Sequence, residues 1–283
     1  MTDTFVAIGF AIFIWWSSTG IVILLNRMSH TAITLSLVIS SLLGIGALVG
    51  LAHTAQQTGV TGAYCAFTCA LLAWGWNELS FLTGWITGPQ KKAILKSTTG
   101  WPRFVASFNA VLWHEVAILI VGIMILMITW DAPNQVGTGT YLVLWIMRTS
   151  AKLNLFFGVR NLSEEFLPAH LAYLESFFKR RPMNAFFPFA VASASACLWL
   201  LVDFSTQPVV TPAQAVGAVL VGTMLTLAIV EHLMLVLPID TTLLWRWAIQ
   251  KQQSKKTAAA FAAHIPAGIS SPLDPHDKSF QVN

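Results

Sequence analysis

Long hydrophobic runs alternate with short polar segments along most of this chain. A helix that crosses a bilayer needs about 20 apolar residues, and lipid offers no partners for free backbone N–H and C=O groups. Each run is therefore expected to be helical, and the period-two alternation typical of barrel strands is absent. The pattern predicts an all-α polytopic membrane protein with seven transmembrane helices, at residues 5–25, 32–51, 62–81, 108–128, 140–157, 185–201 and 213–237.

Composition agrees with this class. Hydrophobic residues make up 55% of the 283 residues and charged residues only 10%, which excludes an ordinary soluble domain. Residues 1–249 are expected to form one transmembrane domain, and the polar tail at 250–283 is expected to be disordered and cytoplasmic. Residues 1–4 hold no Lys or Arg, and no small-residue cleavage site follows, so residues 5–25 are predicted to be a retained helix and not a signal peptide.

The distribution of basic residues predicts an orientation. With the N-terminus outside, the outer segments at 53–61, 131–139 and 203–211 hold no Lys or Arg. This bias is typical of bacterial inner-membrane proteins and predicts a periplasmic N-terminus and a cytoplasmic C-terminus. The net charge of +4 is then explained by basic inner segments, and no nucleic-acid partner is expected. The inner side holds all 16 basic residues: Arg27, Lys91, Lys92, Lys96, Arg103, Arg148, Lys152, Arg160, Lys179, Arg180, Arg181, Arg246, Lys251, Lys255, Lys256 and Lys278.

The segment 168–181 is predicted to be an amphipathic helix on the cytoplasmic surface. Pro168 suits a first helical turn, Pro182 ends the helix, and cations at 179–181 suit a helix C-terminus. At about 100° per residue, His170 falls close in angle to Leu174 and Phe177. His170 is therefore expected to face the helix bundle and not water.

Ionisable residues gather near the predicted inner ends of three spans. An intramembrane charge costs at least ~2.5 kcal/mol near the centre of a helix, so such residues are candidates for function. Adjacent His and Glu residues point about 100° apart, and only one of each pair is expected to face a common centre. The candidate residues are Glu78, His114, Glu115, Glu231 and His232 in the spans, and Glu164, Glu165 and His170 in the segment between spans five and six.

Three interpretations of this set remain open. Carboxylates and imidazoles together are ligands of iron, manganese or zinc, although the Glu-x-x-His spacing of soluble di-iron bundles is absent. Arg148 and Lys152 could instead neutralise the acids in a structural network. The third interpretation is proton handling, or ligation of a bacteriochlorophyll-type pigment by a histidine. These alternatives leave open whether the protein is an enzyme.

Most tryptophans lie near the predicted ends of the spans. An aromatic belt at the two membrane interfaces explains most of them, although a flat tetrapyrrole or a quinone would also suit such a lining. The sequence contains no phosphate-cradling glycine loop, no Cys–His haem motif and no hydrolase nucleophile elbow. The tryptophans in question are Trp15, Trp16, Trp74, Trp76, Trp85, Trp101, Trp113, Trp130 and Trp145.

Several multi-residue blocks match a known family. They are FIWWSSTG at 13–20, GAYCAFTCALLAWGWNELSFLTG at 62–84, TGP at 87–89, WHE at 113–115, APNQVG at 132–137, SAKLN at 150–154, NLSEEFLPAHL at 161–171 and RRPMN at 180–184. From about residue 5 to 240 the chain resembles the PuhE-type photosynthetic complex assembly proteins of anoxygenic phototrophic bacteria.

This resemblance implies an accessory factor of the cytoplasmic or photosynthetic intracytoplasmic membrane. Such a factor would support assembly of the reaction centre and its light-harvesting partner, or modulate bacteriochlorophyll supply. Its expected partners are reaction-centre or light-harvesting subunits, pigment and membrane lipid, and the resemblance carries over no catalytic residues. The alternative function, which rests on the acids and histidines, is a metal-dependent membrane enzyme acting on a lipophilic pigment, carotenoid or quinone-like substrate.

Overall fold

The computed structural model describes residues 2–25, 30–95, 97–162 and 167–238. This part of the chain is all-helical, apart from one isolated bridge between Val159 and Arg180. The expected tail at 250–283 lies outside the described residues. The helices are α1 (Thr2–Leu25), α2 (His30–Thr54), α3 (Val60–Leu82), α4 (Gly100–Ile128), α5 (Val136–Phe157), the 3-10 helix η2 (Ala169–Phe177), α6 (Phe186–Thr206) and α7 (Pro212–Val236).

Each of the seven hydrophobic runs corresponds to one long α-helix. Five of these helices, α1, α2, α4, α6 and α7, are long and apolar enough to cross a membrane, which indicates a multi-pass membrane protein. Helices α3 and α5 are less apolar because they carry Glu78, Arg148 and Lys152. Both helices pack against several others, so their polar side chains can meet partners within the bundle instead of lipid.

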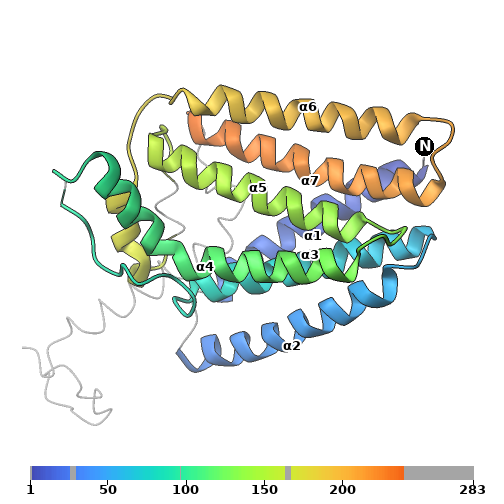
Figure 1. Ribbon diagram of the computed structural model, residues 1–283, viewed down its shortest axis with the longest axis horizontal. Coiled ribbons are helices and arrows are strands. Elements are labelled where there is room, and N and C mark those ends of the chain that lie inside the picture. The colour runs from blue at the N-terminus through green and yellow to red at the C-terminus, as the bar shows by residue number, and fades with distance from the viewer. Residues whose placement is uncertain (1, 26–29, 96, 163–166, 239–283) are drawn as a thin grey trace, which may run out of the picture.

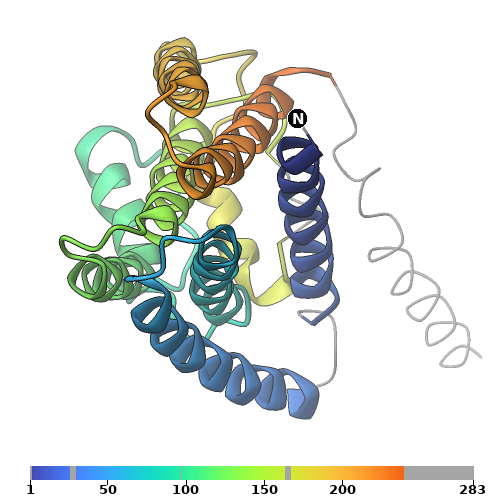
Figure 2. The same ribbon diagram turned by 90° about the vertical axis from the view of Figure 1, so that its right-hand side faces the viewer.

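The long helices run side by side, and consecutive helices alternate in direction (Figure 1). Helix α3 packs against α2, α4, α5 and α7, and α7 also packs against α1, α5 and α6. Seen along the bundle, α2, α4, α6 and α1 lie towards the outside of this group (Figure 2). The helices α3, α5 and α7 therefore form the centre that positions the candidate site.

A hydrogen-bonded aromatic joint connects three helices in the middle of the bundle. The Tyr141 hydroxyl of α5 donates to the Ile118 carbonyl oxygen of α4 at 2.9 Å and accepts from the Asn77 side-chain amide of α3 at 3.1 Å. Trp74 packs edge-on against Tyr141, with ring centroids 5.6 Å apart. Tyr141 is 1% exposed, so its polar atom needs these partners and aligns the three helices.

The connection between α3 and α4 inserts its backbone against α4. The Thr87 carbonyl oxygen accepts from the His114 N–H at 3.0 Å, and the Gln90 N–H donates to the Asn109 carbonyl oxygen at 3.4 Å. Between them, Gly88 approaches α4 so closely that a side-chain carbon there would overlap the Asn109 carbonyl oxygen. Helix α4 is bent (Figure 1), which fits a backbone segment competing for its carbonyl and amide groups.

The predicted amphipathic helix at 168–181 is corrected in two respects. It is a 3-10 helix that ends at Phe177, and residues 178–181 continue as an extended segment paired with Val159. With three residues per turn, Leu171, Leu174 and Phe177 form the buried face. His170 lies off this face and is exposed, although its ring contacts the end of α3, so the expectation that it is turned away from water is wrong.

Asparagine side chains close several helix ends. Asn161 donates from its side chain to the Met234 carbonyl oxygen at 2.7 Å and to that of Leu237, and so caps the C-terminus of α7. The side-chain oxygen of Asn184 accepts from the Phe186 and Phe187 N–H groups at 2.9 and 3.1 Å at the start of α6. These contacts satisfy terminal backbone groups that lipid cannot satisfy.

Gly88 provides a test of the close approach to α4. The substitution Gly88→Ala should lower the free energy of unfolding by about 1–3 kcal/mol, because the backbone of α4 must move to make room. Thermal and SDS unfolding of the purified protein in detergent would measure it. The matched control is Gly46→Ala, since Gly46 has open space around it and should gain up to about 1 kcal/mol from helix propensity. Equal stability of Gly88→Ala and the wild type would contradict the packing.

Candidate functional site

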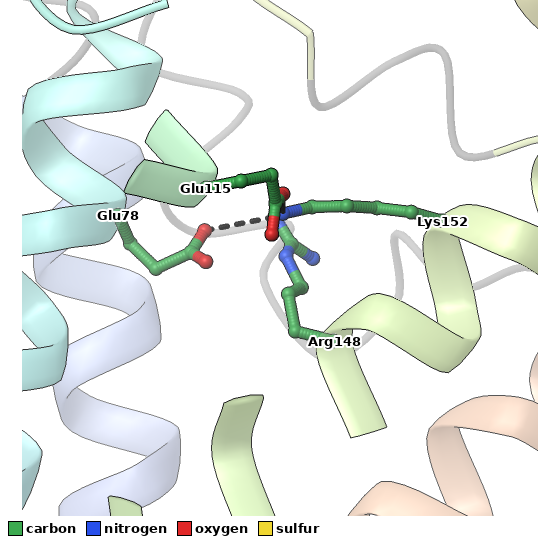
Figure 3. Close-up of polar contacts among 4 residues, drawn as sticks. All are labelled: Glu78, Glu115, Arg148 and Lys152. Atoms are coloured by element: carbon green, nitrogen blue, oxygen red, sulfur yellow. Dashed lines mark hydrogen bonds and ion pairs between the residues drawn. The ribbon is translucent and has the colours of Figure 1, made fainter. Parts of the chain in front are cut away.

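Four of the charged residues form two ion pairs in the bundle. Arg148 Nη2 lies 2.8 Å from Glu78 Oε2, and Lys152 Nζ lies 2.5 Å from Glu115 Oε1. Figure 3 shows the four side chains converging from α3, α4 and α5. The two cations are four residues apart on α5, so they share one face of that helix. We call Glu78, Glu115, Arg148 and Lys152 the charge cluster.

The charge cluster is only partly shielded. The side-chain exposure is 13% for Glu78 and 42% for Arg148, and 20% for Glu115 and 25% for Lys152. Arg148 also interacts electrostatically with Glu115, and Lys152 with Glu78, so the four charges act together. An alternating arrangement of this kind lowers the free energy of keeping each charge away from water.

Glu231 lies beside the charge cluster without joining an ion pair in the described part of the chain. Its Oε1 accepts from the Trp15 indole N–H at 3.0 Å, which connects α7 to α1. It interacts electrostatically with Arg148 and Glu78. With Glu231, the group holds three carboxylates against two cations.

His232 points away from Glu231 and serves as a structural link. It is 2% exposed, and its ring nitrogens lie 2.9 Å from the Ala228 carbonyl oxygen and 2.9 Å from the Ser150 hydroxyl oxygen. One ring nitrogen is thus satisfied within α7 and the other by α5. The contact of His232 with Ser150 holds α7 against α5. Ser150 lies between Arg148 and Lys152 in the sequence of α5, so this contact is next to the charge cluster.

His114 also points away from its acidic neighbour. It is 1% exposed, and its ring lies 4.4 Å from that of Phe81, centroid to centroid. Neither ring nitrogen of His114 has a hydrogen-bond partner in the described structure. A buried imidazole without a hydrogen-bond partner is unfavourable. His114 is therefore the candidate residue whose ring nitrogens remain available to bind a ligand or a proton.

The remaining candidates do not join the charge cluster. His170 lies at the end of α3, where its Nε2 is 3.0 Å from the Leu82 carbonyl oxygen and its ring packs on Gly84. Glu164 and Glu165 lie outside the described residues. Helices α3, α4 and α5 therefore bring together two acids and two cations, with Glu231 of α7 adjacent.

The described residues do not fit a transition-metal centre. No three His, Cys, Asp or Glu side chains gather in a way that could hold a metal ion in the part of the chain that the structure describes. Glu78 and Glu115 are also occupied by Arg148 and Lys152. A carboxylate-bridged metal would have to displace both cations.

Comparison with known sequences places the chain in a family. The sequence profile described as "Protein of unknown function (DUF3623)" matches residues 1–256, which include all of the described residues and the first part of the tail. The chain belongs to this DUF3623 family.

A comparison with individual proteins gives a similar protein whose name records the position of its gene. The chain is 34% identical over 266 residues to "Uncharacterized 30.4 kDa protein in puhA 5'region" of Rhodobacter capsulatus. The matched region covers 91% of this chain and 96% of that protein. No solved structure matches the chain.

Sequence reasoning missed several partners of the candidate residues in this DUF3623 protein. Trp15 was expected to belong to an aromatic belt, but its indole binds Glu231. Ser150 and Asn154 had no assigned role, yet Ser150 bonds His232, and Asn154 Oδ1 accepts from Asn184 at 3.0 Å. All of these positions except Glu231 and His232 fall in the blocks FIWWSSTG, SAKLN and RRPMN, and that clustering was the available signal.

The ion pair of Glu115 and Lys152 can be tested with a double-mutant cycle. The variant Glu115→Gln should unfold about 1–3 kcal/mol more easily, because Lys152 loses its ionised partner away from bulk water. Adding Lys152→Met should restore much of that loss, since no unpaired charge then remains. Unfolding in detergent would measure both.

The control is Glu175→Gln, at an exposed acid of η2 without an ion pair in the described structure, and it should leave stability unchanged. Elemental analysis of the same samples separates the interpretations of the site. A structural network predicts the same metal content in every variant. Bound iron, manganese or zinc that disappears in Glu115→Gln would contradict it.

Proposed function

We propose that this protein is an accessory factor of the bacterial inner membrane, either the cytoplasmic membrane or the photosynthetic intracytoplasmic membrane. It supports assembly of photosynthetic reaction-centre and light-harvesting complexes, or modulates the bacteriochlorophyll supplied to them. The observation that carries the proposal is the 34% identity, over nearly the whole of both chains, to a Rhodobacter capsulatus protein named for the puhA 5′ region. The resemblance to PuhE-type assembly proteins supports the same role.

The site geometry agrees better with a scaffold than with an enzyme. Glu78 and Glu115 are paired with cations, Glu231 accepts a hydrogen bond from Trp15, and His232 is bonded on both ring nitrogens. Such a network satisfies the polar groups inside the bundle and leaves few side chains available as metal ligands or general bases. The alternative, a metal-dependent enzyme acting on a lipophilic substrate, is supported only by the unpaired nitrogens of His114.

We also propose that all seven long helices cross the membrane, with the N-terminus in the periplasm. The connections at 55–59, 129–135 and 207–211 lie at one end of the bundle (right in Figure 1) and contain no Lys or Arg. The connection from α3 to α4 and the segment containing η2 lie at the opposite end, which is rich in basic residues. This separation supports the orientation that the positive-inside bias predicts.

Reporter fusions would test the orientation. Reporters fused at Gln57, Asn134 and Gln207 should lie in the periplasm, and reporters fused at Lys92, Lys179 and the C-terminus should lie in the cytoplasm. Paired alkaline phosphatase and green fluorescent protein fusions give opposite signals at each position, so each is the control for the other. A stable fusion that reports the wrong side would remove a span from this proposal.

Gene deletion would test the cellular role. Removing the gene from a phototrophic bacterium that carries it should lower the absorbance of the assembled reaction centre and core antenna, or change the total bacteriochlorophyll content. Respiratory growth should be unaffected, which separates a photosynthetic role from a general membrane defect. Complementation with the wild-type gene should restore the spectrum. Normal pigment spectra and normal phototrophic growth of the deletion strain would rule the proposed role out.

A further inference from the structure

Three basic side chains are crowded together where α4 begins and α5 ends. Arg103, at the start of α4, is 5% exposed. Its guanidinium donates to the carbonyl oxygens of Phe156, at 3.1 Å, and Phe177, and lies 4.1 Å from the centroid of the Phe156 ring. Its partners are thus neutral dipoles and a ring, and none of them cancels its charge.

Lys179 and Arg181 bring two further positive charges towards Arg103. The pKa of Lys179 is held below its usual range, first by the charge of Arg103, then by desolvation and by the charge of Arg181. Neither Lys179 nor Arg181 forms an ion pair within the described part of the chain. The crowding of like charges is unfavourable as it stands, and an anion beside them would relieve it.

The backbone fixes this arrangement. Val159 N–H donates to the Lys179 carbonyl oxygen at 3.1 Å, and Arg181 N–H donates to the Val159 carbonyl oxygen at 3.0 Å. Residues 179 and 181 therefore project from the same side of an extended segment. Gly158, with φ at +118°, makes room for them, because a side-chain carbon there would come within 2.9 Å of the Arg181 side chain and 3.1 Å of Lys179.

A row of aromatic rings passes beside Arg103 at Phe156 and reaches the surface of the bundle at both of its ends. Its ring centroids are 5.2 to 6.2 Å apart from one member to the next, and it crosses from α4 over the end of α5 to α6. Trp101 and Phe189, at its two ends, are 72% and 67% exposed. The row consists of Trp101, Phe104, Phe156, Phe157, Phe186 and Phe189.

We propose that Lys179 and Arg181, beside Arg103, form a binding site for the phosphate of an anionic phospholipid, whose acyl chains lie along the aromatic row. Positive charge next to exposed aromatic rings is the combination expected at the level of lipid head groups. The site requires the bundle to lie in a membrane, but it does not depend on the photosynthetic role. A free phosphate would use the same cations without the aromatic row.

The test uses the full-length protein purified in a neutral detergent. Native mass spectrometry and thermal unfolding are measured with added phosphatidylglycerol, phosphatidylcholine or inorganic phosphate. Phosphatidylglycerol should remain bound and raise the unfolding temperature by several degrees, and phosphatidylcholine should do neither. Equal effects of the two lipids would overturn the proposal, and this comparison needs no variant. If inorganic phosphate reproduces the whole effect, the ligand is a free phosphate and the lipid assignment is wrong.

Variants then locate the site. Lys179→Gln combined with Arg181→Gln should weaken phosphatidylglycerol binding by about 30-fold, which is about 2 kcal/mol at about 1 kcal/mol for each basic residue near an anionic surface. Lys91→Gln combined with Lys92→Gln removes two exposed basic residues from the α3–α4 connection and should change binding little. An equal loss in both double variants would show non-specific attraction and contradict the site. If the first double variant does not fold, the two single variants are measured in its place.

Discussion

Ion pairing inside an apolar bundle is the constraint on which the centre of this protein depends. A lone charge near the middle of a transmembrane helix costs at least ~2.5 kcal/mol. Glu78 on α3 and Glu115 on α4 are neutralised by Arg148 and Lys152, which lie one turn apart on α5. Helix α5 must therefore present this face to both α3 and α4, and its position in the bundle follows from that requirement.

The same requirement separates the two members of each His–Glu pair. Glu115 turns towards Lys152, so His114 turns towards Phe81, and its buried ring nitrogens have no hydrogen-bond partner among the described residues. In the same way Glu231 bonds Trp15, and His232 bonds Ser150 and the Ala228 carbonyl oxygen. Neighbours on a helix point about 100° apart. In each pair the glutamate therefore lies in or beside the charge cluster, and the histidine packs against a different neighbour.

At the basic end of the bundle, backbone hydrogen bonding takes over the organising role. Backbone groups at the ends of helices need partners that lipid does not offer. Asn161 and Asn184 bond such groups at the ends of α7 and α6, and the bridge of Val159 and Arg180 pairs the residues after α5 with those before α6. This bracing gives the basic end a defined surface, which the proposed lipid site requires.

The sequence by itself determined the class and the number of long helices in the described part of the chain, and it predicts that the basic residues lie on one side of the membrane. These properties depend on composition and on the length of the hydrophobic runs. The thickness of the bilayer sets the length of a spanning helix, and charged residues are excluded from its lipid-facing part. It also placed Glu78, Glu115, Arg148 and Lys152 at similar depth. Glu164 and Glu165, with the tail, remain sequence predictions.

Only the tertiary structure decided which residues meet. The rotation of each helix about its axis selects Glu115 over His114 for the charge cluster, and hydropathy carries no information about that rotation. The change from α to 3-10 geometry in η2 moved His170 out of the buried face, because a period of three aligns Leu171, Leu174 and Phe177 instead. The insertion of Gly88 against α4 and the crowding of Arg103, Lys179 and Arg181 likewise join residues far apart in the chain, and only packing brings such residues together.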